Sequence, residues 1–341
     1  MTDLTTGNTA SALEGEYTAL RTSAIVIDRS QRSRGTFGGA KGAEVLTGLV
    51  TNDVLALVEG TGCYAAALTP KGKIIADVRI FLRTADVLVD VPPRAAAGWL
   101  SMVKKYVNPR LSRYQDVSDA LFDLSVYGRS SASILAKALG TDDAPIMALS
   151  DFGHVVVIAW GLSITVARVP DLGIDGFALF VPAAGRARAW EALQREGATP
   201  AGPDVFNVAR IESGRPEWGI EMNENTLPQE ANLDVLHAIS YTKGCYTGQE
   251  TVARIHFRGH VNRHLRGVRF DETASFPPGG ELFDAAGKSV GEIRSVALSP
   301  KLGGVGLAMV RREVAMDSEL DVRSDDGGGR ARVVDLPFVR G

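Results

Sequence analysis

Residues 243–250 read KGCYTGQE, the most specific string in the chain. Its single thiol, Cys245, has Gly244 before it and Gly248 shortly after it, so little side-chain cover is expected over the sulfur. The ammonium of Lys243 would favour the thiolate, which is the form of cysteine that attacks electrophiles and binds metals. A helix that begins after Gly248 would act in the same direction through its dipole. The string predicts a reactive Cys245; the plainer alternative is a small buried thiol.

Length and charge restrict the classes of protein to which the chain can belong. Its 341 residues accommodate two or three domains, and its net charge of −3 lacks the basic excess of a protein that wraps duplex nucleic acid. The longest uncharged apolar stretch, residues 155–167, is too short to span a bilayer. Residues 1–16 lack the basic start and apolar stretch of a signal peptide. We therefore expect a cytoplasmic protein without stable nucleic-acid binding and without a membrane partner.

The cysteine count also limits the chemistry. Cys63 and Cys245 are the only two cysteines, which fits a reducing compartment. Two thiols cannot by themselves complete a four-thiolate cluster or a structural zinc site, so no resident metal is expected. Cys63 lies in an apolar stretch and is expected to be a core thiol that forms no disulfide with Cys245.

Hydrophobic patterning predicts α+β architecture. Strands are expected at 63–68 and 73–82 on either side of a Pro/Gly turn, and a helix with its exit at 40–54. A strand, a helix, a hairpin, a strand and a helix follow between 121 and 196. Short strands with Gly/Pro turns near the C-terminus are typical of a small β-barrel. The expected divisions are a flexible tail, 1–16; a first α+β domain, 17–117 with 203–259; a second α+β domain with an antiparallel sheet, 118–202; and a barrel, 260–341.

Several stretches carry a resemblance to a known family. The string at 243–250 matches, without a gap, the motif Lys-Gly-Cys-Tyr-x-Gly-Gln-Glu of the YgfZ family. That family is related to the glycine-cleavage T-protein. The other stretches that resemble these proteins are LVTNDV at 49–54, LTPKGKIIAD at 68–77, ARIESGRP at 209–216 followed by Trp218-Gly219, and NTLPQEA at 225–231. The resemblance runs from about Tyr17 to the C-terminus.

The resemblance implies a fold, a cofactor and two site residues. It implies three domains in a clover-leaf ring around a central channel that holds tetrahydrofolate or a derivative. Asp77 corresponds to the aspartate that the T-protein uses near the reactive nitrogen of the folate. Glu212 corresponds to the glutamate that binds the pterin. A carboxylate can accept hydrogen bonds from the amide and amino groups of the pterin.

The chain also departs from the T-protein pattern. An asparagine of the T-protein falls at Val91 here, and an arginine of the T-protein falls near Tyr241. The T-protein has no cysteine at the position of Cys245. These departures indicate that the chain lacks part of the residue set that the T-protein uses for aminomethyl transfer.

Further candidates for binding the folate lie in and after the KGCYTGQE string. They are Tyr246, with an apolar ring and a hydroxyl; Gln249 and Glu250, which bind polar groups or cap a helix; and Arg254. Arg254 opens a basic run that extends to Arg266. Such a run suits folate glutamates, an acidic partner surface or RNA; the alternative is a solvated face.

Three functions remain open at this point. The resemblance implies a folate-binding accessory protein that supports assembly or repair of iron–sulfur proteins, including radical enzymes of tRNA modification. Cys245 would then be the functional residue, with Lys243 beside it. Its thiol would act either as a transient ligand of a cluster or through redox chemistry. The alternative is an enzyme, a tetrahydrofolate-dependent aminomethyltransferase or demethylase that uses Asp77 to polarise the folate nitrogen. The third is a binding module with an inert thiol.

Overall fold

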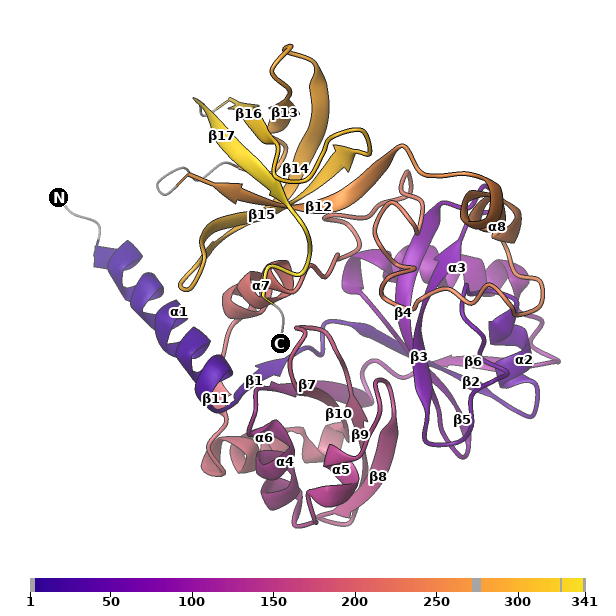
Figure 1. Cartoon of the computed structure of the whole chain (residues 1–341). Coiled ribbons are helices and arrows are strands. Elements are labelled where there is room, and N and C mark those ends of the chain that lie inside the picture. Colours follow the sequence, from indigo (N-terminus) through magenta and orange to yellow (C-terminus); the bar gives the residue numbers. More distant parts are fainter. Residues whose placement is uncertain (1–3, 272–276, 326, 340–341) are drawn as a thin grey trace.

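The computed structural model of the chain describes residues 4–271, 277–325 and 327–339. Three lobes meet around a common centre, two built from a sheet with helices and one built as a barrel (Figure 1). The predicted fold class, two α+β domains with a C-terminal β-barrel, is confirmed.

The first lobe is a five-stranded antiparallel sheet covered on one face by a helix. Along β4, Ala76, Val78 and Ile80 pack into the core that holds Trp99 of α3. The intervening side chains of this strand therefore face the other way, towards the centre of the molecule. The sheet order is β3 (Gly62–Leu68), β4 (Ile74–Leu82), β5 (Asp86–Val91), β2 (Ser33–Gly38) and β6 (Arg113–Asp116), with helices α2 (Gly42–Thr47) and α3 (Ala96–Tyr106).

The second lobe has a six-stranded sheet. It is antiparallel except for the short parallel pairing of β1 with β11. Leu124 and Val126 of β7 pack against the helices of this lobe, which leaves the alternate residues of β7 on the central side. The sheet order is β11 (Thr199–Pro200), β1 (Ile25–Asp28), β7 (Leu121–Tyr127), β10 (Gly176–Pro182), β9 (Leu162–Arg168) and β8 (His154–Ala159), with helices α4 (Ser131–Leu139), α5 (Ala144–Met147) and α6 (Arg186–Arg195).

The third lobe is a closed six-stranded barrel. Its interior is filled by aliphatic side chains such as Val268, Leu282 and Ile293. The strands are, in barrel order, β12 (Arg263–Phe270), β15 (Gly303–Arg311), β14 (Ser289–Ser299), β13 (Glu281–Phe283), β16 (Glu319–Ser324) and β17 (Gly327–Val334).

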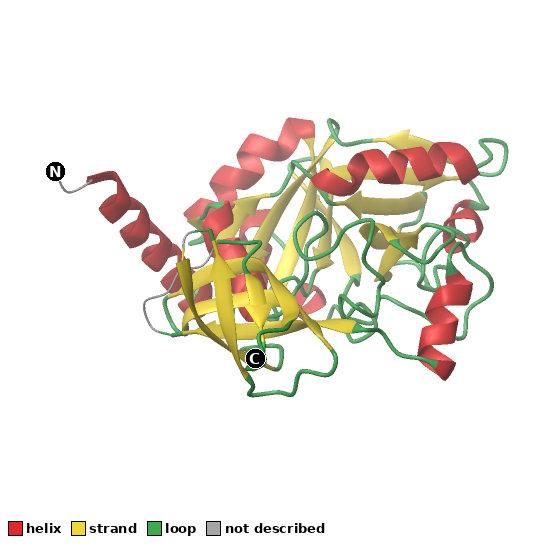
Figure 2. Cartoon of the chain, turned by 90° about the horizontal axis from the view of Figure 1, so that it is seen from above, coloured by secondary structure: helices red, strands yellow, loops and turns green. Residues whose placement is uncertain are grey.

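Three further helices connect or flank the lobes. Helix α7 (Pro203–Glu212) lies between the barrel and the second lobe, and α8 (Gln249–Arg258) lies beyond the first lobe (Figure 1). Helix α1 (Leu4–Thr22) extends from the body in both views (Figures 1 and 2). Within the described residues, no helix is long and apolar enough to cross a membrane.

Three local expectations differ from the structure. Most of the expected tail at 1–16 is helical, as part of α1. Strand β1, assigned to the first domain by sequence, pairs instead with β7 of the second lobe. The helix expected at 40–54 is only six residues long, Gly42–Thr47. At and beyond its end, the carbonyls of Thr47, Val50 and Asn52 accept hydrogen bonds from a distant lysine, Lys243.

Candidate functional site

Charged side chains from the two sheets meet at the centre of the molecule. Arg79 of β4 lies 3.8 Å from Asp123 of β7 and 3.4 Å from Asp90 of β5. Arg79 also forms an ion pair of 2.5 Å with Asp171, in the loop between β9 and β10. Burial alone would raise the pKa of Asp171, but the guanidinium groups of Arg79 and Arg29 lower it to about 2. This buried network fixes the two sheets relative to each other.

Beside this network lies a small cavity of about 60 Å³, here called the narrow cavity. It is lined by residues from both α+β lobes and from the segment that follows α7. Its lining residues are Arg29, Arg32, Tyr64, Asp77, Arg79, Pro92, Phe152, Asp171, Phe206, Arg210, Arg215, Pro216 and Glu217.

Asp77 is the unusual group in the narrow cavity. One carboxylate oxygen, Oδ2, accepts a 2.8 Å hydrogen bond from the hydroxyl of Tyr64. The other, Oδ1, is buried and has no hydrogen-bond partner among the described residues. Burial raises the pKa of the Asp77 carboxyl, and the nearby guanidinium of Arg32 opposes that shift. A buried, half-satisfied carboxyl beside a cavity is equipped to bind a donor on a ligand or to exchange a proton with it.

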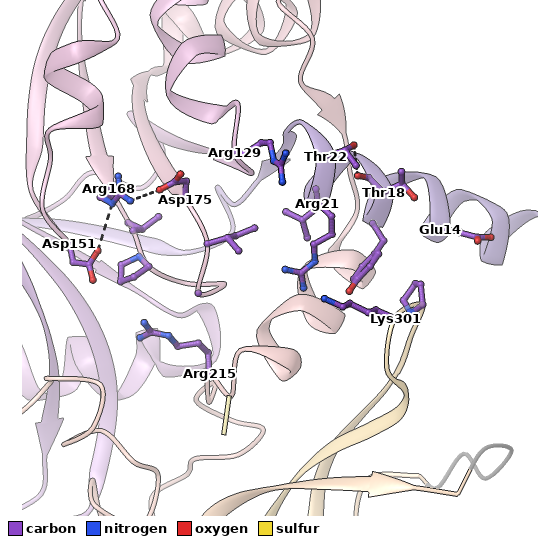
Figure 3. Close-up of a pocket in the computed structure, with 17 residues that line it drawn as sticks. Glu14, Thr18, Arg21, Thr22, Arg129, Asp151, Arg168, Asp175, Arg215 and Lys301 are labelled. Carbon is purple, nitrogen blue, oxygen red and sulfur yellow. Dashed lines mark hydrogen bonds and ion pairs between the residues drawn. The ribbon is translucent and has the colours of Figure 1, made fainter. Parts of the chain in front are cut away.

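A second, wider cavity of about 1100 Å³ adjoins the first. The two cavities share Arg215 as a lining residue. Adjacent residues of the chain also line both, since Pro170 faces the wide cavity and Asp171 the narrow one. Figure 3 shows Arg21 and Lys301 on one side of the wide cavity and Arg215 on another. The lining includes five basic side chains, of Arg21, Arg129, Arg168, Arg215 and Lys301, and three acidic ones, of Glu14, Asp151 and Asp175.

Glu212, the expected pterin ligand, lies at the junction of three elements. It ends α7, is almost completely buried and lines neither of the two cavities. Its carboxylate accepts hydrogen bonds from the hydroxyl of Tyr17 at 2.9 and 3.1 Å, from the guanidinium of Arg21 and from the hydroxyl of Ser299. These partners come from α1 and from the end of β14. The geometry gives Glu212 a structural role, holding α1 and the barrel against α7.

The KGCYTGQE string forms a loop and the start of α8, away from both cavities. The ammonium of Lys243 donates to the carbonyls of Thr47, Val50 and Asn52 at 2.6, 2.7 and 2.8 Å. These bonds use all three N–H donors of the side chain, so none is left for the Cys245 thiol. Burial lowers the pKa of the Lys243 ammonium to about 8. The structure thus makes Lys243 a clamp for the segment after α2, and a role of its charge in activating the Cys245 thiol stays a prediction.

The same string packs against the Pro/Gly turn at residues 69–72, which the sequence analysis predicted independently. Gly248 has φ +83°, and a Cβ on it would lie 2.5 Å from the carbonyl oxygen of Thr69. A Cβ on Gly72 would lie 2.8 Å from the side chain of Thr251. Glycine is therefore required where the turn at 69–72 meets the start of α8.

Cys245 itself is exposed, and both cysteines are free thiols, as expected. Tyr246 is buried, with its ring 4.8 Å from the Lys243 ammonium. Gln249, Glu250 and Arg254 lie on α8. None of these four expected folate contacts, nor Cys245 or Lys243, lines the narrow or the wide cavity. Of the eight site residues expected from the sequence, only Asp77 lines one.

The exposure of the thiols predicts unequal reactivity. Cys63 should alkylate slowly, because burial raises the pKa of its thiol to about 12 and few thiolates form at neutral pH. Exposed Cys245 should react at least about tenfold faster with iodoacetamide, followed by peptide mass spectrometry. In denaturing urea the two rates should converge. Equal rates in the folded protein would contradict this assignment.

The Lys243 clamp predicts a loss of stability on substitution. Lys243→Met keeps the apolar stem but leaves three main-chain carbonyls without a donor, so we expect a loss of at least about 2 kcal/mol in unfolding free energy. Lys73→Met is the matched control, because its ammonium donates to a single exposed carbonyl, that of Asn225. That variant should lose less than about 1 kcal/mol in urea denaturation. Equal losses in the two variants would contradict the stabilising role assigned to the Lys243 ammonium.

With the geometry in place, comparison with known proteins assigns the family. Residues 6–241 match the GCVT N-terminal domain, and residues 263–340 match the glycine cleavage T-protein C-terminal barrel domain. The chain belongs to the glycine-cleavage T-protein family. Among its relatives in this family is the aminomethyltransferase of Ralstonia pickettii, 31% identical over 95% of this chain and 88% of the relative.

Other relatives are consistent with this membership. The aminomethyltransferase of a Nostoc species is 28% identical over 97% of this chain and 88% of the relative. A putative chloroplastic transferase of Arabidopsis thaliana is 27% identical over 92% of this chain and 71% of the relative. The crystal structure of the glycine-cleavage aminomethyltransferase of Bartonella henselae superposes with a TM-score of 0.85 at 20% identity, covering 96% of this chain and 90% of that one. This last likeness confirms the T-protein fold.

Proposed function

We propose that this T-protein family member binds tetrahydrofolate at the central cavities and catalyses a one-carbon transfer of the aminomethyltransferase type. Its relatives in Ralstonia and Nostoc are named aminomethyltransferases, which supports this function and tetrahydrofolate as the cofactor. The single observation that carries the proposal is the buried, unpartnered Oδ1 of Asp77 at the narrow cavity.

The fit of a folate to these residues rests on two features. The unpartnered Asp77 oxygen suits an N–H donor of a pterin or a reduced ring nitrogen. The wide cavity has room for a drug-sized ligand, since typical ligand sites measure about 300–1,000 Å³. The narrow cavity alone, at about 60 Å³, is too small for a bicyclic ring. A ring that approaches Asp77 therefore has to displace lining side chains, and we propose that Arg215, which lines both cavities, is the one that moves.

The chemistry assigned to the chain is proton transfer and orientation. Tetrahydrofolate, when bound, supplies the amine nitrogen that carries the one-carbon unit. The Tyr64 hydroxyl holds Oδ2 of Asp77, which leaves Oδ1 free for the ligand. Because burial raises its pKa, the Asp77 carboxyl is better matched to proton exchange near neutral pH than an exposed aspartate. The Asp77 side chain is almost fully buried, which limits the access of bulk water to that proton.

A transfer assay tests this function. Wild-type protein is incubated with tetrahydrofolate and small aminomethylated amine donors, and folate-dependent formation of methylene-tetrahydrofolate, with release of the amine, is measured. Asp142→Asn, at an exposed acid that lines neither cavity, is the matched control for Asp77→Asn. Turnover that needs folate, survives in Asp142→Asn and is lost in Asp77→Asn supports the proposal. Binding of folate without turnover of any such donor contradicts the catalytic part.

A second function is favoured by the KGCYTGQE string. Its match to the YgfZ motif, together with the exposure of Cys245, supports an accessory role in assembly or repair of iron–sulfur proteins, including those of tRNA modification. An exposed thiol away from the cavities is accessible to a client protein while folate is bound. The departures at Val91 and Tyr241 favour this function over complete T-protein activity.

Complementation separates the second function from the first. In a strain that lacks the protein, Cys245→Ser at native expression should fail to restore iron–sulfur enzyme activity although it still binds folate. Cys63→Ser is the matched control, because Cys63 is only partly exposed and lies in the core of the first lobe. Full rescue by Cys245→Ser would exclude a chemical role for this thiol.

A further inference from the structure

We propose that the chain forms a reversible two-fold dimer in which strand β8 of one copy pairs antiparallel with β8 of a second copy. The six-stranded sheets of the two copies would then join into one continuous sheet. Strand β8 lies at the opposite edge of its sheet from β11, on the outer side of the second lobe (Figure 1). The inference concerns this edge and depends neither on folate binding nor on Cys245.

The first argument is the free main-chain edge of β8. In the described part of the chain, β8 pairs with β9 and with no other strand. Alternate residues of an edge strand point their N–H and C=O groups away from the sheet. The N–H of His154 points outward, since it donates to the carbonyl of Gly60 at 2.8 Å and not to β9. Val156 and Ile158 share this orientation, and among the described residues their N–H and C=O groups have no hydrogen-bond partner.

The second argument is the apolar character of this edge. The side chain of Val156 is 52% exposed and that of Ile158 is 70% exposed. Two further exposed apolar residues lie nearby, Met147 of α5, which packs beside β8, and Val58, in the loop that holds Gly60. The stretch HVVVIAWGLS at 154–163 contains no Lys, Arg, Asp, Glu or Pro. Because natural proteins protect free edges with charged residues or proline, an edge without them is typical of a strand that another strand covers.

The third argument identifies that other strand as β8 of a second copy. A two-fold axis at Val157 places Val156 of each copy opposite Ile158 of the other. Both residues point their main-chain groups outward, so each of these pairs can exchange both of its N–H···O=C hydrogen bonds. This register satisfies the free groups of both edges. The exposed side chains of the same residues then meet on one face of the joined sheet.

The two ends of β8 also fit this arrangement. The loop with Gly60 covers the edge at His154 and blocks a strand that continues past that residue. In the antiparallel pair this loop faces the other end of the second β8, where the turn at Trp160 leads the chain back into β9. Glu59 is exposed in the loop, and exposed Arg188 stacks on Trp160, 5.2 Å from the ring centroid. The two-fold axis therefore brings opposite charges of the two copies together at each end.

The mass of the protein in solution tests the dimer. Stable dimers bury about 800 Å² on each partner, which exceeds what one short strand provides, so the dimer should depend on concentration. In sedimentation velocity, we expect the mass of one chain at about 1 µM and a mass approaching two chains at about 300 µM. Ile158→Lys places a charge on the edge and should raise the dissociation constant at least about tenfold. Leu298→Lys, at a residue 72% exposed on β14, is the matched control and should leave it unchanged.

A pair of cysteine variants tests the register, in a Cys245→Ser background that removes the exposed native thiol. Val157→Cys lies opposite itself across the two-fold axis, where the Cα atoms of a non-hydrogen-bonded pair are about 4.5 Å apart and within reach of a disulfide. Val155→Cys is the matched control, because both valines are half-buried on the same face of β8. With diamide as the oxidant, Val157→Cys should form covalent dimers at least about tenfold faster than Val155→Cys, whose two copies lie too far apart.

Each outcome decides the inference. A dimer that is weakened by Ile158→Lys, kept in Leu298→Lys and linked through Val157→Cys supports it. A protein with the mass of one chain at every concentration overturns it. A dimer that forms equally well in Ile158→Lys uses another surface and also overturns it. Equal rates of cross-linking for Val155→Cys and Val157→Cys reject the antiparallel register.

Discussion

Asp77→Asn is expected to reduce folate-dependent one-carbon transfer at least about 100-fold, because an amide cannot exchange the proton that a carboxyl can. The substitution preserves shape and can still accept the hydrogen bond from the Tyr64 hydroxyl, so folding should survive. The measurement is turnover under saturating folate. A variant that retains more than a tenth of the wild-type rate would exclude proton transfer by Asp77.

The same substitution should change stability with a definite pH dependence. The folded-state pKa of Asp77 is raised above 3.8, so the folded protein loses stability as the pH rises from that value through the folded-state pKa. Asparagine carries no charge and avoids this loss. We therefore expect Asp77→Asn to exceed wild type in unfolding free energy at neutral pH and to match it below about pH 3.8. A site that gains stability when its charge is removed is typical of functional carboxyls.

Glu212→Ala is the second large effect, and it concerns assembly of the lobes. Truncation leaves the Arg21 guanidinium and the Tyr17 hydroxyl without their acceptor at a junction that is almost fully buried. Breaking a buried charge pair in this way costs about 3–5 kcal/mol. We expect that loss in urea denaturation followed by tryptophan fluorescence. Glu191→Ala, on the exposed face of α6, should lose less than about 0.5 kcal/mol.

Glu212→Gln distinguishes a structural role from the pterin contact implied by the sequence. The amide keeps one acceptor oxygen for Tyr17 or Ser299 and should fold. If Glu212 acts only as a junction, folate affinity should stay within about threefold of wild type, because its carboxylate lines neither cavity. A loss of tenfold or more with unchanged stability would restore Glu212 as a pterin ligand.

Much of the fold follows from local sequence signals. The strands at 63–68 and 73–82 and the turn between them were predicted within a residue, because apolar side chains and a Pro-x-Gly turn define them. The barrel followed from short strands separated by Gly/Pro turns. The stretch at 40–54, expected to hold a helix and its exit, is helical only over Gly42–Thr47, and the carbonyls of Thr47, Val50 and Asn52 are bound by a lysine almost 200 residues away. Local patterning carries no information on such a partner.

The candidate site was predictable only in part. Asp77 was identified through family resemblance, yet the ion network beside it was missed. A local signal existed, since Asp77 and Arg79 interrupt the otherwise apolar strand IIADVRIFL, and Asp123 interrupts LFDLSVY. Charges on the central face of a buried strand must find partners, which points to a shared polar interior. The wide cavity could not be predicted from the sequence. Its residues Arg129, Arg215 and Lys301 come from three separate segments, and only the tertiary structure brings them to one cavity.

Folate bound to the crystalline protein gives the most direct test of the central claim, that the ligand lies beside Asp77. Crystals of the full chain would be soaked with 5-formyltetrahydrofolate, with Asp77→Asn crystals treated in parallel. The account predicts density for the pterin with a ring nitrogen within hydrogen-bond distance of Asp77 Oδ1, Arg215 displaced, and the glutamate in the wide cavity. Folate bound beside Cys245 and α8, with both cavities unchanged, would contradict it.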